Sequence, residues 1–325
     1  MEYVKLGNTD LSVSKITFGC WEMGGTQWEF TNDENNINAV RKALSLGITS
    51  FDTAEGYGNG HSEEVLGKAL GAERKNIVLA TKVSNTHLKP QDLADALKNS
   101  LKRLNTDYLD VYYIHWPSFQ IPLADTIGAM VKLKEQGLIR AIGLSNFDIG
   151  LLTEAMSYGR IDAIQPEYSL LHRAIEAEVL PWCVENNVSV MSYSSIAKGI
   201  LAGVFHVNGV KLSEDDFRAP RRLFTKEDLE KETPIVNLVK NIAEQKGVSM
   251  SQVAIAWLLA KPGMTSAIVG TQNEKHLIDN LKAVDLSLTA QEAAQLDATS
   301  AEVLMAIDGG MGTVAQIPSD NVRIR

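Results

Sequence analysis

Three ionisable side chains each follow a short apolar run in the early part of the sequence. Asp52, Lys82 and His115 come directly after runs rich in Val, Ile, Leu and Tyr, and Tyr57 lies shortly beyond Asp52. If these runs are neighbouring strands of one sheet, all four side chains face the same volume. Each residue alone has a structural explanation, such as a turn cap or a packed ring. Together they favour a functional site, because a buried ammonium and imidazole are costly unless both are paired.

The chemistry that this set supports is acid catalysis. A phenol with a pKa of about 10 is a poor proton donor at neutral pH. The Lys82 ammonium is expected to lower the pKa of Tyr57, and Asp52 would keep Lys82 charged and in place. His115 would orient a carbonyl oxygen against Tyr57, which protonates it as a hydride arrives. One histidine and one aspartate are too few ligands for a metal, so we expect no metal site.

Polar residues also close the later apolar runs. Ser145 and Asn146 follow the fifth run, Gln165 ends the sixth and Tyr193 ends the seventh. Amide and hydroxyl groups beside a flat aromatic face suit a planar carboxamide ring. The same residues could instead cap loops and pack in the core, so on their own they leave both interpretations open.

Eight apolar runs alternate with helical patterns along the chain. Their starts fall 22 to 32 residues apart, except for a long last interval. This repeat predicts eight parallel strands, in a closed (β/α)8 TIM barrel or an open doubly wound sheet. The open sheet would need a GxGxxG turn after its first strand, whereas Gly19–Gly25 reads GCWEMGG. We therefore predict the barrel, with strands at Ile16–Phe18, Ile48–Phe51, Ile77–Thr81, Leu109–Ile114, Ile139–Gly143, Ile161–Gln165, Val188–Tyr193 and Ser266–Val269, and helices such as Glu34–Leu46, Pro90–Leu104, Leu123–Gln136, Ala174–Glu185 and Asn273–Leu281.

Three segments fall outside the repeat. The first, Tyr3–Val13, is predicted to be a hairpin that plugs the bottom of the barrel. The second is a long loop after strand 7, over Ala197–Thr233, and loops of this length are usually functional or disordered. The third is an irregular C-terminal tail from about residue 303. We predict one barrel domain over residues 1–325, and the long loop carries a basic cluster of Arg218, Arg221, Arg222 and Lys226.

The composition is typical of a globular protein. Its 325 residues are 45% hydrophobic and 22% charged, which is enough for one large core. The net charge of -9, with no basic block longer than Arg221-Arg222, disfavours nucleic acids and anionic membranes as partners. The sequence shows no signal peptide or membrane-spanning run, and its two distant cysteines indicate no disulfide framework. We therefore expect a cytoplasmic protein, and we predict no oligomeric state.

The motifs above resemble the signature segments of the aldo-keto reductase family, in the same order. The resemblance extends from Leu6 to about Ala283 and implies a (β/α)8 barrel with NADP(H) lying across its mouth. Asp52, Lys82 and His115 would then form the catalytic tetrad with Tyr57, which is the general acid/base. The segments that carry the resemblance are Phe51-Asp52-Thr53-Ala54 with Tyr57, Thr81-Lys82, Tyr113-Ile114-His115-Trp116 and Gly143-Leu144-Ser145-Asn146-Phe147.

The resemblance also implies where the cofactor lies. Ser145, Asn146 and Gln165 would hold the nicotinamide carboxamide, with Tyr193 stacked on the ring. The adenosine phosphate would lie at the last helix, and a helix N-terminus after a glycine is a natural phosphate site. The other predicted cofactor contacts are Trp21, Ser194, Ile196, Gly199, Arg218, Gly270, Gln272, His276, Asp279 and Asn280.

The predicted cofactor preference depends on cations near the adenosine end. The helix itself offers only Gln272, Lys275 and His276. A 2′-phosphate needs at least one well-placed cation, so we expect Arg218 and Arg221 of the long loop to fold over it. The expected result is a modest preference for NADP(H), with NAD(H) also used.

The favoured substrate is a small aldehyde, ketone, sugar or polyol, bound among Trp21, Trp28, Trp116 and the tail. One alternative is a Schiff-base lyase, because a lysine at a barrel strand end is also how class I aldolases work. The other is a cofactor-binding regulatory module, because potassium-channel β subunits resemble this family. We expect this module to be the weaker interpretation, since the sequence shows no segment before the hairpin and no apolar patch.

Overall fold

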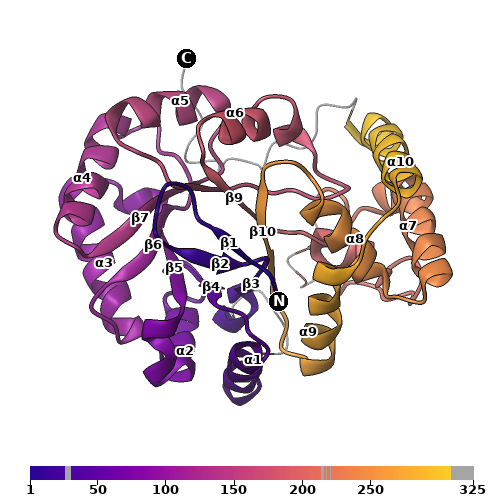
Figure 1. Ribbon diagram of the computed structural model, residues 1–325, viewed down its shortest axis with the longest axis horizontal. Helices are drawn as coiled ribbons and strands as arrows, with labels where there is room; N and C mark the ends of the chain where they lie inside the picture. Colours follow the sequence, from indigo (N-terminus) through magenta and orange to yellow (C-terminus); the bar gives the residue numbers. More distant parts are fainter. Residues whose placement is uncertain (26–30, 214–215, 217, 220, 309–325) are drawn as a thin grey trace.

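The structure is a computed structural model that describes residues 1–25, 31–213, 216, 218–219 and 221–308. Eight parallel strands close into a barrel in the order β10-β3-β4-β5-β6-β7-β8-β9, and helices surround them (Figure 1). The predicted (β/α)8 TIM barrel is confirmed, and every strand lies within a few residues of its predicted position. The strands are β3 (Ile16–Gly19), β4 (Ser50–Asp52), β5 (Val78–Val83), β6 (Leu109–Ile114), β7 (Ile139–Ser145), β8 (Ala163–Gln165), β9 (Ser189–Ser192) and β10 (Met264–Val269).

Strand alternation sorts side chains between the inside of the barrel and the helices. In β5, Val78 and Ala80 pack in the inner cluster, whereas Leu79 and Val83 pack in the large outer core. Lys82 has the same parity as Val78 and Ala80, so it points into the barrel near the end of its strand. The helices are α1 (Asp33–Ser45), α2 (His61–Leu70), α3 (Pro90–Leu104), α4 (Leu123–Glu135), α5 (Ile149–Tyr158), α6 (Val179–Glu185), α7 (Lys226–Lys246), α8 (Met250–Leu259), α9 (Glu274–Leu281) and α10 (Ala290–Asp308).

The N-terminal hairpin closes one end of the barrel, as predicted. Strands β1 (Tyr3–Lys5) and β2 (Ser12–Ser14) pair antiparallel and lie across the barrel opening in Figure 1. Leu6, Leu11 and Val13 belong to the same buried cluster as the inward side chains of the barrel. The carboxyl ends of the strands, where the candidate site residues lie, are therefore at the opposite end.

A polar seam joins the first and last barrel strands. β10 pairs in parallel with β3, and Thr17 Oγ1 lies 2.8 Å from Ser266 Oγ. Ser266 also donates to the backbone oxygen of Ser14 at 2.8 Å. Residues about 250 positions apart in the chain thus share buried hydroxyl hydrogen bonds, which fix the register where the barrel closes.

Three predicted boundaries are wrong. The long loop ends at Thr225, where the side chain of that residue caps α7, so the helix begins well before Thr233. Pro234 inside α7 and the charged first turn disguise its helical pattern. The predicted helix Ala174–Glu185 is a 3-10 turn followed by α6, which begins at Val179.

The irregular tail also begins later than predicted. Helix α10 continues to Asp308, because Val303, Leu304 and Ile307 are buried at helical spacing. The rest of the predicted tail, 309–325, lies outside the described residues.

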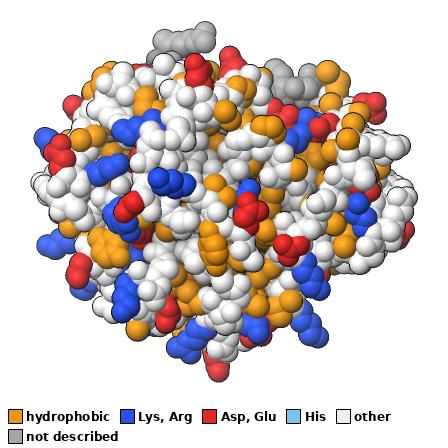
Figure 2. Space-filling view, viewed as in Figure 1, with side chains coloured by type: hydrophobic (Ala, Val, Ile, Leu, Met, Phe, Trp, Pro, Cys, Tyr) orange, Lys and Arg blue, Asp and Glu red, His pale blue; other side chains and the backbone are white. Residues whose placement is uncertain are grey.

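Charges of both signs are mixed over the face of the molecule in Figure 2. This distribution agrees with the acidic net charge and shows no extended basic area on that face. In the part of the chain that the structure describes, no helix is both long and apolar enough to cross a membrane. Cys20 and Cys183 are both buried and unpaired with each other.

Candidate active site

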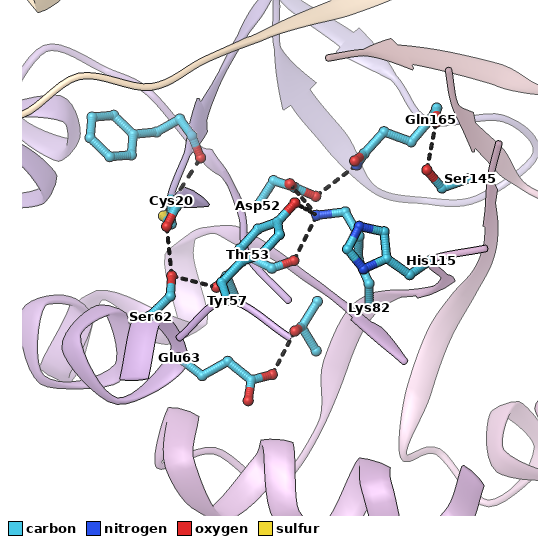
Figure 3. Close-up of polar contacts among 12 residues, drawn as sticks. Cys20, Asp52, Thr53, Tyr57, Ser62, Glu63, Lys82, His115, Ser145 and Gln165 are labelled. Carbon is cyan, nitrogen blue, oxygen red and sulfur yellow. Dashed lines mark hydrogen bonds and ion pairs between the residues drawn. The ribbon is translucent and has the colours of Figure 1, made fainter. Parts of the chain in front are cut away.

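The structure brings the four predicted catalytic residues together at the mouth of the barrel (Figure 3). Asp52 ends β4 and Lys82 lies on the neighbouring β5, and Lys82 Nζ donates to Asp52 Oδ1 at 2.6 Å. Lys82 Nζ also donates to the backbone oxygen of Thr53 at 2.8 Å and to Tyr57 Oη at 3.1 Å. All three hydrogens of the ammonium therefore have acceptors, and the side chain is only 1% exposed.

Lys82 is held in its charged form. Burial lowers the pKa of Lys82, but the Asp52 charge and the contact with Tyr57 raise it by more, so the net pKa lies above its ordinary value. A protonated amine has no lone pair with which to attack a carbonyl carbon. The surroundings of Lys82 therefore weigh against the Schiff-base lyase.

The expected direction of the Tyr57 pKa shift is wrong. Burial raises the pKa of Tyr57 above its ordinary value, and the Lys82 charge lowers it without overcoming that effect. The neighbouring ammonium is visible in the sequence, whereas the loss of solvation on burial is not. At neutral pH Tyr57 is therefore a phenol that still carries its proton, with the Lys82 ammonium positioned to stabilise the phenolate that would form on proton transfer.

His115 is a neutral imidazole beside the phenol. Its ring lies edge-on to the Tyr57 ring, with the centroids 5.6 Å apart. Burial, with a smaller effect from the Lys82 charge, lowers the pKa of His115 from 6.5 to about 3. A neutral ring can hold a carbonyl oxygen by a hydrogen bond, but it has no extra proton to deliver at neutral pH.

The low pKa of His115 predicts a specific loss of stability in acid. The unfolded histidine binds a proton below pH 6.5 and the folded one does not, so stability is complete above pH 6.5 and falls towards pH 3. We expect His115→Gln to lose less stability over this range, by at most about 1.4 kcal/mol per pH unit. Denaturant unfolding of both proteins from pH 7 to pH 4 measures the difference, and parallel curves would contradict the buried neutral state.

The second predicted set is connected to the tetrad by hydrogen bonds. Gln165 Nε2 donates to Asp52 Oδ2 at 2.7 Å, and Ser145 Oγ donates to the backbone oxygen of Gln165 at 2.7 Å. Asn146 Nδ2 donates to the backbone oxygen of His115 at 2.9 Å, and Asn146 Oδ1 accepts from Tyr193 Oη at 2.8 Å. The contact between Gln165 and Asp52 was not foreseen, and it occupies the second carboxylate oxygen of Asp52.

A cavity of about 800 Å³ extends from these residues along the mouth of the barrel. Gln272 and Lys82 are not part of its wall, although Lys82 lies directly behind Tyr57. Trp28 lies outside the described residues. The predicted residues that line the cavity are Trp21, Asp52, Tyr57, His115, Trp116, Ser145, Asn146, Gln165, Tyr193, Ser194, Ile196, Gly199, Arg218, Gly270, His276, Asp279 and Asn280.

The cavity wall also contains an ion pair that was not predicted from the sequence. Lys198 Nζ lies 2.7 Å from Glu167 Oε1, and both residues line the cavity. Lys198 has a positive φ of 52°, within a 3-10 helix over Ala197–Ala202. Glu167 could have been predicted, because it lies two residues after Gln165, which ends β8. The contact with Lys198 could not, because it depends on the turn that brings Lys198 next to Glu167.

The donor set of the cavity fits a dinucleotide. One end offers the amide and hydroxyl groups beside Tyr193, which match a carboxamide ring. Arg218, Arg221 and Lys198 also line the cavity and offer positive charge for the phosphates of a dinucleotide. The wall also includes Gly270, where a Cβ would come within 2.7 Å of the backbone oxygen of Gly19, and His276 in the first turn of α9.

The fold and this cavity belong to a known class of oxidoreductase. The sequence profile of the Aldo/keto reductase family matches residues 15–301. The chain therefore belongs to the aldo-keto reductase family.

Individual relatives cover nearly the whole chain. It is 35% identical over 288 residues to aldo-keto reductase YhdN of Bacillus subtilis, covering 85% of this chain and 87% of that protein. It is 31% identical over 317 residues to the NADH-specific methylglyoxal reductase of Escherichia coli, covering 90% of this chain and 96% of the relative.

Solved structures show the same correspondence. The thermostable aldo-keto reductase Tm1743, in complex with the inhibitor epalrestat, has a TM-score of 0.77 at 36% identity, covering 92% of this chain and all of that one. An aldo-keto reductase of Klebsiella pneumoniae in complex with NADP and acetate has a TM-score of 0.72 at 33% identity, covering 91% of this chain and 95% of that one.

Proposed function

We propose that this protein is an NADP(H)-dependent reductase of small aldehydes, ketones or sugar-like carbonyls, able to act in reverse on the alcohols. The observation that carries the proposal is the contact between the Lys82 ammonium and the Tyr57 phenol, which lies in the wall of the cavity. A nicotinamide cofactor, when bound, supplies or accepts the hydride. Each residue of the site has a distinct part in the accompanying proton transfer.

Tyr57 donates its proton to the substrate oxygen and becomes a phenolate. Lys82 stabilises that phenolate, and Asp52 keeps Lys82 charged and aimed at Tyr57. His115, as a neutral ring, holds the substrate oxygen in line with the phenol. Ser145 and the residues hydrogen-bonded to it position the nicotinamide ring. The substrate carbonyl can then approach only one face of that ring.

The substrate end of the cavity is walled by aromatic rings. The Trp21 and Tyr57 ring centroids are 6.3 Å apart, and those of His115 and Trp116 are 6.5 Å apart. Flat apolar walls around one hydrogen-bonding point suit a small organic carbonyl. A thermal-shift screen with NADP+, NADPH, NAD+ and NADH, followed by assays with carbonyl and polyol panels, tests the proposal. No stabilisation by any of the four forms would contradict it.

Both nicotinamide cofactors occur among the relatives. The Klebsiella protein was solved with NADP, whereas the Escherichia coli relative is named as NADH-specific. In this chain Arg218 lines the cavity, and its guanidinium is paired with Asp216 at 2.7 Å. Arg218 also stacks over the Phe205 ring, with 5.6 Å from its central carbon to the ring centroid. The loop thus holds Arg218 at the cavity, as the proposed NADP(H) preference needs.

We expect Arg218→Ala to reduce the preference for NADPH over NADH by about tenfold, because one charge-assisted contact with the 2′-phosphate is worth about 1.5 kcal/mol or more. The ratio of kcat/KM for the two cofactors measures it. Arg222→Ala is the matched control, because Arg222 belongs to the same loop but is not part of the cavity wall. A strict NADH preference in the wild type, or an unchanged ratio in Arg218→Ala, would refute the role of Arg218.

A further inference from the structure

Helix α2 begins immediately after the Tyr57 loop, and its first turn carries two fully buried polar residues. Ser62 and Glu63 are both 0% exposed. Ser62 Oγ donates to the backbone oxygen of Cys20 at 2.7 Å and lies 2.8 Å from Thr53 Oγ1 (Figure 3). Thr53 is the residue whose backbone oxygen accepts from Lys82. Ser62 therefore ties the start of α2 to the ends of β3 and β4.

Glu63 makes the corresponding connection to β5. Its Oε1 accepts from Thr81 Oγ1 at 2.6 Å, and its Oε2 accepts from Arg103 Nε of α3 at 2.6 Å. Because strand side chains alternate, Thr81 points outward to the helices while Lys82, the next residue, points inward to Tyr57. One carboxylate thus holds the backbone segment from which the catalytic ammonium extends.

The local backbone leaves room for this arrangement. Gly60 precedes α2 with a positive φ of 92°, and a Cβ there would come within 2.5 Å of the Arg103 side chain. The carboxylate of Glu63 also lies in the first turn of α2, where the helix dipole favours negative charge. The loop between β4 and α2, which contains Tyr57, is consequently fixed at both ends by side chains that the proton transfer itself does not use.

We propose that Glu63 is a positioning residue for proton transfer: by holding Thr81 and Arg103 it keeps Lys82 Nζ within hydrogen-bonding distance of Tyr57 Oη. The inference rests on the proposed function. In that reaction the hydride from the reduced nicotinamide forms the C–H bond, the carbonyl π pair moves to oxygen, and that oxygen takes the proton as the Tyr57 O–H bond breaks. The phenolate that remains needs the Lys82 ammonium beside it.

The contact that Glu63 supports is the longest of the three made by Lys82. The distance to Tyr57 Oη is 3.1 Å, against 2.6 Å to Asp52 and 2.8 Å to Thr53. A small displacement of β5 would therefore weaken the contact with Tyr57 before the other two. A misplacement of about 1 Å can lower a rate by about 100-fold, so the position of this strand has a direct catalytic effect.

The experiment compares Glu63→Gln and Thr81→Val with two controls. Glu64→Gln changes the exposed neighbour of Glu63. Asp162→Asn changes another buried carboxylate, which pairs with Lys134 just before β8, at the opposite end of the barrel. The measurements are kcat for carbonyl reduction, the Kd of NADPH from fluorescence, the melting temperature, and the pH dependence of alcohol oxidation.

We expect Glu63→Gln and Thr81→Val to lower kcat about tenfold or more while the Kd of NADPH changes less than about twofold. The midpoint of the pH profile for alcohol oxidation should move to higher pH, because the nearby ammonium lowers the pKa of Tyr57 and its effect weakens. Thr81→Ser keeps the hydroxyl and should restore kcat. Asp162→Asn should lower the melting temperature with an unchanged kcat, and Glu64→Gln should change neither.

Two results would overturn the inference. One is a wild-type kcat in Glu63→Gln or Thr81→Val, with at most a lower melting temperature like that of Asp162→Asn. The other is a loss of kcat with an unmoved pH midpoint or without recovery in Thr81→Ser. Thr81→Val provides the answer if Glu63→Gln does not fold. Failure of the proposed function is distinguishable, because Tyr57→Phe would then keep its activity whatever Glu63→Gln does.

Discussion

Tyr57→Phe is expected to lower the rate of carbonyl reduction by about 100- to 10,000-fold, the usual contribution of a positioned general acid. Only the hydroxyl is lost, and the ring can keep its contacts with Trp21 and His115. Binding of NADPH should therefore stay within about 1 kcal/mol of the wild type. Steady-state oxidation of NADPH measures the rate, and fluorescence titration measures the affinity.

Tyr158→Phe is the matched control for this substitution. Tyr158 ends α5 and is 44% exposed, and among the described residues its hydroxyl makes only a long contact with Glu154 at 3.4 Å. It should have wild-type kinetics. If Tyr57→Phe retains more than a few per cent of the wild-type kcat, Tyr57 is not the proton donor, and the assignment of the whole tetrad fails with it.

Lys82→Met is expected to be as severe for catalysis, and it should also destabilise the fold. The substitution removes the cation next to the phenol and leaves the Asp52 carboxylate buried without its partner. Breaking a buried ion pair on one side costs about 3–5 kcal/mol. Denaturant unfolding and kcat, measured on the same preparation, report the two effects.

The double variant Asp52→Asn/Lys82→Met separates the loss of activity from the loss of stability. Removing both charges eliminates the unpaired carboxylate, so most of the lost stability should return. Activity should not return, because the phenolate formed by Tyr57 would still have no cation beside it. A double variant with wild-type kcat would show that Lys82 is only a structural partner of Asp52.

The residues at the strand ends were predictable because their location depends only on the spacing of the apolar runs along the sequence. Asp52, Lys82 and His115 follow recognisable apolar runs, and parallel strands of a closed barrel must end at one rim. The direction of the Tyr57 pKa shift was not predictable in this way. It depends on how completely neighbouring segments exclude water, which is a property of the packed molecule.

Contacts between distant loops were also beyond the sequence. The ion pair of Glu167 and Lys198 requires a backbone turn in which Lys198 has a positive φ. In a sequence, such turns are usually recognised from a glycine or an asparagine and not from a lysine. The start of α7 was predicted wrongly for a different reason, because its charged first turn and Pro234 obscure the apolar spacing of what is a continuous helix. The strands, and the end of the barrel at which the site lies, were therefore predictable from the sequence. The side-chain contacts between loops were not.

The seam between β3 and β10 bears on how the protein is synthesised. Thr17 is synthesised early, but its hydroxyl can bond to Ser266 only after most of the chain has been translated. Contacts of such sequence separation form slowly, since a long loop must close before they stabilise anything. The cavity has Gly19 and Gly270 in its wall, one from each side of this seam. A nascent chain interrupted before β10 would therefore have all four tetrad residues but no complete cavity, so ligand binding would distinguish finished molecules from truncated ones.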